Sequence, residues 1–297
     1  MEEELRRAAF GDSPDLAVWS ALCAGSSRVR WLAAVVLGGQ GHYAAAATVL
    51  AALRHDPDPV IASLSLSTRA SHLRQLGAHH LARPLDGAAL ARVRGTDAGD
   101  PDGIDAAGAR TDALLGLAAD SLGAQRLGEA RRLLARAETR SWRAEVRRGW
   151  VSAEVELASG RAQAAVAPAE EAHGVATRRK ALRHELKSAL VLGTSLVVRG
   201  TPEGLERGHE LVGCELNHSA LKKLHPLIWP SALVLVGHAP TVGADVLDRA
   251  TDALSCVLRR ADAVSRRAAL ESPWVPTGLL RSGEPPNADP QANFLTD

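Results

Sequence analysis

The chain has 297 residues, 46% of them hydrophobic and 23% charged, which is enough apolar surface for a folded core and too much for a disordered chain. Its 35 Lys and Arg nearly balance its 34 Asp and Glu, and a net charge of +1 excludes a chain drawn by overall charge to nucleic acid or membranes. The apolar residues are mainly 55 Ala and 42 Leu, with only three Ile, two Phe and one Tyr. Because strands favour β-branched and aromatic residues and helices favour Ala and Leu, this composition predicts an all-α fold.

The N-terminus and the apolar stretches favour a cytoplasmic protein with no membrane partner. Met1-Glu2-Glu3-Glu4 has the wrong charge for the start of a signal peptide. The longest apolar stretches, 31–37 and 227–236, fall far short of the ~20 residues that a membrane-spanning helix needs. The three cysteines are odd in number and widely spaced, which does not suggest a disulfide framework.

An internal repeat begins in the segment 28–59, where two apolar helical stretches meet at Gly41 and small residues stand before and after the turn, at Ala34 and Ala46. This pattern resembles the tetratricopeptide repeat, a helix–turn–helix unit of about 34 residues. The same spacing of small and turn residues recurs at Gly77 with Ala70 and Ala82, Gln125 with Ala118 and Ala130, Gly160 with Ala153 and Ala165, and, with a short insertion, Gly200 with Gly193 and Gly208. Small residues at these places let two helix backbones approach closely.

The resemblance implies a right-handed α-α superhelix, a solenoid of about five helix–turn–helix units with capping helices, because each pair must cover the apolar face of the next. From the residues alone, an irregular all-α bundle with Ala-rich interfaces is the alternative. We expect capping helices over 1–27, with one helix from Ser13-Pro14 to Gly25, and then repeats over 28–225 with an insertion loop at 95–108. A capping hairpin follows over 226–271, with helices at 227–238 and 244–268 that are separated by a break at Pro240. The last part is a Pro-rich tail over 272–297, of which Trp274-Val275 can dock back on the helices.

No residue pattern predicts a metal or a cofactor. The insertion loop contains Asp97, Asp100, Asp102 and Asp105, but Ala98 and Ala109 stand where an EF-hand needs oxygen ligands, so we expect a solvated linker. A second set, His209, Cys214, His218 and His225, lacks a Cys-x-x-Cys clamp, and we interpret it as a half-buried Cys beside surface histidines. His72, His79 and His80 follow no ligand spacing and are expected to be exposed.

Catalytic patterns are also missing, and we expect no catalytic residue and no enzyme. Ser219-Ala220-Leu221-Lys222 matches an S-x-x-K acylation pattern without its partner motifs, and Gly38-Gly39-Gln40-Gly41 lacks a phosphate-binding frame. Cys23, Cys214 and Cys256 lie in apolar helical stretches, where a free cysteine acts as a small hydrophobic residue.

The distribution of charge suggests where a partner binds. Residues 126–187 contain 14 Lys and Arg against eight Asp and Glu. In helical solenoids the first helix of each unit lines the concave groove, and the repeat pattern places six candidate partner-binding residues there: Arg28, Trp31, Arg74, Arg147, Trp150 and Lys187. We therefore expect a non-catalytic adaptor or regulatory scaffold that binds an acidic protein or peptide in a basic, Trp-containing groove. The alternatives are a nucleic-acid-associated regulator that uses the patch 126–187, and a merely solvated basic face.

Overall fold

The computed structural model describes residues 1–297 except 24, 94, 96–98, 239–243 and 283–297. Within these described residues the regular structure is helical and contains no strand, so the predicted all-α class is confirmed. The helices are α1 Glu2–Phe10, the 3-10 helix η1 Trp19–Leu22, α2 Ser27–Gly39, α3 Tyr43–Leu53, α4 Pro59–Arg74, α5 His79–Arg92, α6 Ala106–Gly123, α7 Leu127–Arg136, α8 Trp142–Ala158, α9 Ala162–Arg178, α10 Leu182–Arg199, α11 Pro202–Leu221, α12 His225–His238, α13 Ala244–Arg259, α14 Ala263–Glu271 and α15 Leu279–Ser282.

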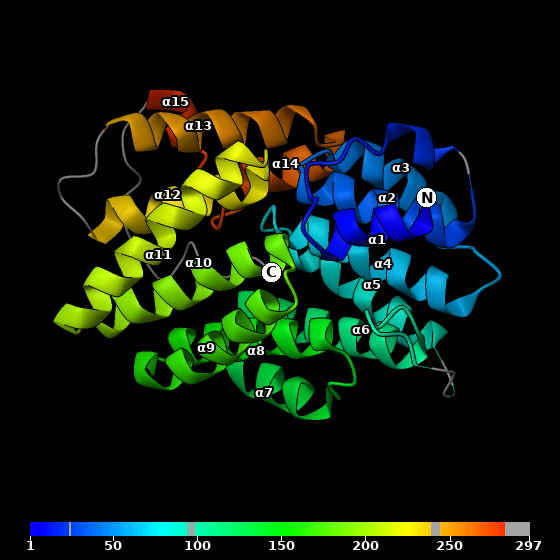
Figure 1. The fold of residues 1–297 in the computed structure, drawn as a ribbon, viewed down its shortest axis with the longest axis horizontal. Helices are drawn as coiled ribbons and strands as arrows, with labels where there is room; N and C mark the ends of the chain where they lie inside the picture. The colour runs from blue at the N-terminus through cyan, green and yellow to red at the C-terminus, as the bar shows by residue number, and fades with distance from the viewer. Residues whose placement is uncertain (24, 94, 96–98, 239–243, 283–297) are drawn as a thin grey trace.

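The helices form two layers (Figure 1). The even-numbered helices from α2 to α12 pack against one another in chain order and form the inner layer. Each odd-numbered helix from α3 to α13 packs against the helix before it and forms the outer layer. The chain therefore runs as consecutive helix pairs, and one helix of each pair faces the middle of the molecule.

The small residues predicted at the helix crossings lie where the two helices of a pair touch. The eight alanines of this set, Ala34, Ala46, Ala70, Ala82, Ala118, Ala130, Ala153 and Ala165, are all 0% exposed. In the pair α10–α11, a Cβ on Gly193 would lie 3.0 Å from the Gly208 carbonyl oxygen, which leaves no room for a side chain. The five predicted turn residues, Gly41, Gly77, Gln125, Gly160 and Gly200, all adopt positive φ values between 58° and 83°.

The first and last parts of the chain meet. Gly41 at the first turn lies against Pro226 and Val257, and the Ala44 N–H donates to the Arg260 carbonyl at 2.8 Å. At the other side α1 packs against both α2 and α10, and the Leu182 N–H donates to the Gly11 carbonyl at 3.0 Å. These contacts close the row of inner helices around a central space.

The N-terminal segment differs from the prediction. The helix expected from Ser13-Pro14 to Gly25 is absent; the chain makes a turn at 14–15 and only η1 follows. The Ser13 hydroxyl donates to Asp12 at 2.8 Å instead of capping a helix. The amide of Gln40 donates to the carbonyls of Pro14 and Leu16 at 2.9 and 3.0 Å, so a tertiary contact holds these carbonyls out of a helical pattern.

The predicted long helix 244–268 is also wrong, because it is interrupted between Arg259 and Ala263. Asp262 caps the new helix α14 by accepting from the N–H groups of Val264 and Ser265 at 3.1 and 3.0 Å. Arg266 reaches back and donates to the carbonyls of Leu258, Arg259 and Ala261, where α13 ends. The predicted break at Pro240 lies outside the described residues.

The described start of the tail docks on the helices. Val275 is 4% exposed and Leu279 is 2% exposed, and the Trp274 ring lies edge-on to His79 with ring centroids 6.2 Å apart. The short helix α15 lies in the predicted Pro-rich tail. Ser272 and Trp274 cover the turn between α4 and α5 at Gly77, whereas α15 packs against α13.

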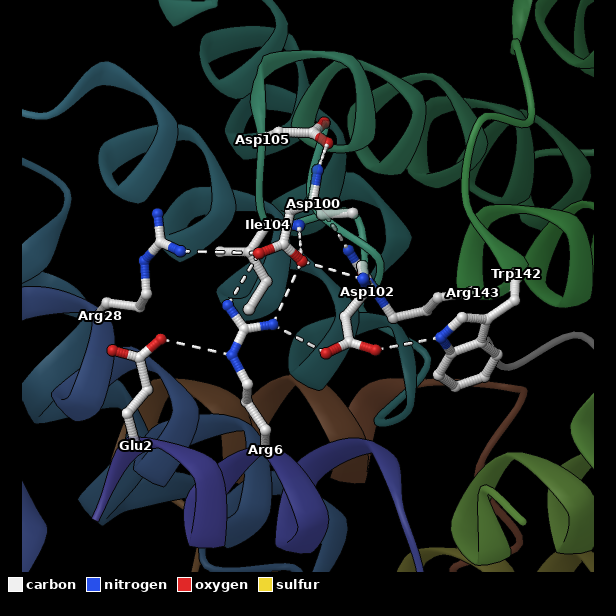
Figure 2. Close-up of polar contacts among 10 residues, drawn as sticks. Glu2, Arg6, Arg28, Asp100, Asp102, Ile104, Asp105, Trp142 and Arg143 are labelled. Carbon is white, nitrogen blue, oxygen red and sulfur yellow. Dashed lines mark hydrogen bonds and ion pairs between the residues drawn. The ribbon is translucent and has the colours of Figure 1, made fainter. Parts of the chain in front are cut away.

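The insertion between α5 and α6 is not a solvated linker over its described residues 99–105. Asp100 accepts from Arg6 on α1 at 2.8 and 3.2 Å and from the backbone N–H groups of Asp102 and Ile104 (Figure 2). Asp105 caps α6 by accepting from the Gly108 N–H at 2.7 Å. Asp97 lies outside the described residues. Asp100 and Asp102, two of the carboxylates that suggested a solvated loop, instead fasten it to Arg6 on α1.

Candidate functional site: a central cationic cavity

A cavity lies between the inner helices. Residues from α1, α2, α4, α6, α8, α10 and α12 line it, so every inner helix contributes. Its interior volume is about 90 Å³, and this rises to about 890 Å³ only when the open solvent at its mouth is included. The lining residues are Phe10, Trp31, Val35, Ser67, Thr68, Ser71, His72, Gln75, Asp112, Arg143, Arg147, Trp150, Arg183, His184, Lys187, Leu190, Pro226, Leu227 and Pro230.

One wall of the cavity is cationic. Arg143 and Arg147 are one turn apart on α8, and Arg183 and Lys187 are one turn apart on α10. Asp112 is the one acid among the lining residues, and it pairs with Arg143 at 2.7 Å and with Arg147 at 2.6 Å. The side chains of these two arginines are only 7% and 12% exposed, so their charges lie in a largely dehydrated environment. Lys187 lies 3.4 Å from the buried Glu154, which supplies a second carboxylate behind the wall.

Two tryptophans form equivalent parts of the lining. Trp31 on α2 donates through Nε1 to the Thr68 hydroxyl on α4 at 3.0 Å. Trp150 on α8 donates through Nε1 to the Ser188 hydroxyl on α10 at 2.7 Å. In each case the indole bridges to the next inner helix, and its polar edge is satisfied while the ring faces the cavity. Both rings are therefore held in place before any ligand arrives.

The two histidines of the lining are uncharged at neutral pH. Burial, with smaller effects of Arg69 and Arg183, lowers the pKa of His72 to about 3. Burial and the nearby arginines 183, 143 and 147 hold the pKa of His184 well below its usual value. His184 stacks on Trp150 with centroids 5.6 Å apart and rings 22° from parallel. The histidines thus act as aromatic wall, and the positive charge comes from Arg and Lys.

A polar network behind the wall holds Arg143 in position (Figure 2). Its guanidinium donates to the carbonyls of Asp102 and Gly103 at 2.8 and 3.2 Å as well as to Asp112. The Asp102 carboxylate accepts from Arg6 at 2.7 Å and from the Trp142 indole at 3.1 Å. Burial raises the pKa of Asp100, but hydrogen bonds from Arg6 and backbone N–H groups outweigh it and lower that pKa overall. Helix α1 and the insertion therefore brace one cation of the cavity.

The structure brings together four of the six predicted partner-binding residues. Trp31, Arg147, Trp150 and Lys187 line the cavity. Arg28 lies in the α1–insertion network instead, 3.6 Å from Asp100 (Figure 2).

Arg74 is the clearest departure from the prediction. Its side chain is 0% exposed and pairs with Asp86 at 3.0 Å and Asp120 at 2.8 Å, so it is sealed inside the α4–α5–α6 packing and cannot reach a partner in this structure.

Several lining residues were not predicted. Arg143 could have been found, because it precedes the predicted Arg147 by one helical turn on the same face. Phe10 and the α12 residues Pro226, Leu227 and Pro230 carry no such signal, because they reach the cavity only through closure of the inner layer.

The basic stretch 126–187 does not form one surface. Its arginines 143, 147 and 183 and Lys187 line the cavity, whereas others form ion pairs on the outside, including Arg131 and Arg161 with Glu156. Arg140 pairs with Glu138 at 2.8 Å, and both side chains are more than 60% exposed. The excess charge of this stretch is therefore divided between two faces.

Other candidate sites take different forms from those expected. Cys23 and Cys214 are exposed and Cys256 is half-buried, so the first two are not hydrophobic core residues. His72 and His79 are buried, contrary to the prediction. Across the described part of the chain, no group of three or more His, Cys, Asp or Glu is placed to hold a metal ion. No helix in that part combines the length and apolarity needed to cross a bilayer.

A comparison of the sequence with protein-family models and with curated proteins finds no match.

Proposed function

We propose that this chain is a tetratricopeptide-like solenoid of about five units with capping helices, and that it serves as a non-catalytic adaptor or regulatory scaffold. Consecutive helix pairs, buried small residues at all predicted crossings and left-handed turns at the five predicted places support this architecture. The inner helix of each pair lines one shared cavity, which is the place a solenoid offers to a partner.

The cationic wall is the observation that carries the choice of partner. Four Lys and Arg side chains line the cavity beside one carboxylate, in surroundings that also contain two tryptophans. A recessed positive site focuses the field on anions, and the tryptophan faces add apolar contact area. We therefore propose an acidic protein or peptide segment as the partner.

The proposal is tested with fluorescein-labelled short peptides of Asp and Glu around a single Phe, measured by fluorescence anisotropy against the purified chain. A peptide with Asn and Gln in place of every acid is the matched probe. We expect the acidic peptide to bind and Arg147→Gln or Lys187→Gln to weaken it by roughly ten- to hundredfold, the loss typical of one charged hydrogen bond. Arg161→Gln, on the outer face, is the control. Equal binding of the two peptides would contradict the proposal.

The same assay separates the proposal from nucleic-acid binding. Duplex DNA or RNA contacts release counterions, so their affinity falls steeply and linearly on a log–log plot against salt concentration. Tight, salt-sensitive binding of a labelled duplex with no binding of the acidic peptide would favour the nucleic-acid regulator instead.

A further inference from the structure

The cavity has less room than the proposed partner needs. Its interior volume is about 90 Å³. An apolar protein cavity that holds a single benzene molecule measures roughly 150 Å³. A side chain with an aromatic ring therefore enters only if a lining group moves. Phe10 is the lining residue that α1 contributes, and it is the one that comes from outside the consecutive helix pairs.

The Phe10 ring lies among rings and a cation that belong to three inner helices. Its centroid is 6.1 Å from that of Trp31 on α2 and 6.1 Å from that of His184 on α10. The Arg143 guanidinium of α8 lies over the same ring, 5.3 Å from its centroid. Ring pairs at such separations and a guanidinium over a ring face are favourable contacts. Trp31, Arg143 and His184 therefore form an aromatic subsite that fits one aromatic side chain.

The walls of the aromatic subsite are held by contacts that do not involve α1. The Trp31 indole donates to a hydroxyl group of α4 at 3.0 Å. His184 stacks on Trp150 of α8, with ring centroids 5.6 Å apart. Arg143 donates to Asp112 of α6 at 2.7 Å. The subsite is thus prepared for an aromatic ring by the inner layer itself, and α1 supplies only the ring that fills it.

Helix α1 is an addition to the row of helix pairs. It packs against α2 and α10, whereas each inner helix from α2 to α12 packs against an outer helix of its own. Its polar attachment is a clasp of three side chains, in which Arg6 pairs with Asp100 at 2.8 Å and with Asp102 at 2.7 Å (Figure 2). A backbone bond from the Leu182 N–H to the Gly11 carbonyl follows its last turn. Removal of α1 from this place leaves the contacts within and between the helix pairs intact.

We propose that Phe10 is a built-in occupant of the aromatic subsite, and that the acidic partner segment carries an aromatic residue that displaces α1 and takes the place of the Phe10 ring. The clasp holds α1 in the closed position while no partner is bound. The inference rests on the proposed function for its site. It adds a required residue type to the partner, and it makes α1 an internal competitor of that partner.

The first test varies the partner. In the anisotropy assay, the acidic peptide with its single Phe is compared with an acidic peptide that has Ala in place of this Phe. We expect the Phe peptide to bind at least about tenfold more tightly, because its ring replaces the contacts that Phe10 gives up. Equal affinities of the two acidic peptides would overturn the inference.

The second test opens the clasp. Arg6→Gln removes the cation that faces Asp100 and Asp102, and Arg7→Gln removes the neighbouring arginine, which pairs with the exposed Asp12, as the matched control. If only the open chain accepts the ring, the apparent affinity scales with the open fraction. We therefore expect Arg6→Gln to tighten the Phe peptide by roughly three- to tenfold and Arg7→Gln to leave it unchanged. Asp100→Asn replaces Arg6→Gln if circular dichroism shows that the latter does not fold. No gain in the clasp variant, or an equal gain in the control, contradicts the inference.

Hydrogen exchange followed by mass spectrometry observes α1 without relying on the peptide. In the free chain we expect α1 to exchange faster than α2 and α10, and faster still in Arg6→Gln, because it opens as a local unit. Addition of the Phe peptide should increase exchange in α1 further. If α1 exchanges as slowly as α2 and α10 in both the free chain and the complex, it is a fixed part of the core and the inference is wrong.

These readouts separate the inference from the proposed function. If the acidic peptide binds with or without its Phe and α1 stays protected, the inference fails and the proposed function stands. If α1 opens on its own and opens further in Arg6→Gln, but no acidic peptide binds, the acidic partner is wrong and the displaceable helix stands.

Discussion

Two clusters of Arg and Asp in this molecule are built from the same residue types and pair them in opposite ratios. In the sealed cluster, Arg74 meets two carboxylates, Asp86 and Asp120, and all three side chains are 0% exposed. In the cavity cluster, two arginines meet the single carboxylate of Asp112 and are 7% and 12% exposed. These ion pairs join one arginine to two acids in the first cluster and two arginines to one acid in the second.

The two clusters differ in how their charge can change. A carboxylate can take up a proton, and burial indeed raises the pKa of Asp86 to about 7 even though Arg74 opposes this shift. An arginine cannot give up its proton at any physiological pH. The sealed cluster can therefore lose its charge by taking up a proton, whereas the arginines of the cavity cluster stay charged.

The largest effect is expected from Arg74→Met. It removes the cation that compensates two buried carboxylates, and loss of one partner of a buried ion pair costs about 3–5 kcal/mol. Urea unfolding measures the loss. Arg83→Met, which removes a partly exposed pair with Glu129, is the control and should cost much less. Acidic-peptide affinity of the folded variant should be unchanged; a specific loss of affinity would place Arg74 in the binding site after all.

Ala153→Trp compares two faces of one helix. Ala153 is 0% exposed in the α8–α9 pair, while Trp150 on the same helix faces the cavity. Overpacking the sealed face should cost on the order of 1–3 kcal/mol or more, seen as a lower thermal midpoint. An unchanged midpoint would show that the predicted crossing position is not a close helix contact.

Asp112→Asn tests the cavity cluster, because it removes the carboxylate that competes with an incoming anion for Arg143 and Arg147. We expect a loss of stability on the order of 1–3 kcal/mol, since two buried arginines lose their carboxylate. Binding of the acidic peptide should change in the opposite direction, with the peptide raising the thermal midpoint more in the variant than in the original chain. A smaller rise in the variant would count against an anion at this wall.

The pH dependence of stability tests the sealed cluster. The pKa of Asp86 is raised from 3.8 to about 7 on folding, so between these values the native state holds a proton that the unfolded chain has released. The contribution of this group to stability therefore falls as the pH rises from about 4 to about 7. Asp86→Asn should flatten this part of the profile of unfolding free energy against pH. An identical slope in both proteins would mean that Asp86 is ionised when folded.

Local errors in the prediction have a common physical cause. Ser13-Pro14-Asp15 has every feature of a helix start, yet Gln40 takes the carbonyls of Pro14 and Leu16 and no helix forms there. Asp262 has the right chemistry for a cap, but it falls inside the continuous helix predicted over 244–268. Distant partners act in both cases, since Asp262 also pairs with Arg69 on α4 at 2.9 Å, and local propensity is weak against such contacts.

The sequence by itself determined the helical class, the helix pairs and their turns, because Ala, Leu and Gly act through local backbone preference and through contacts a few residues away. It also indicated Trp31, Arg147, Trp150 and Lys187 as groove residues, and all four lie on the cavity-facing side of the inner helices. Only the tertiary structure decided that Arg74 is sealed while Arg147 is accessible to the cavity, and that α1 and α12 complete the lining. Burial and charge balance depend on which distant segments meet, and the spacing of residues along one helix does not contain that information.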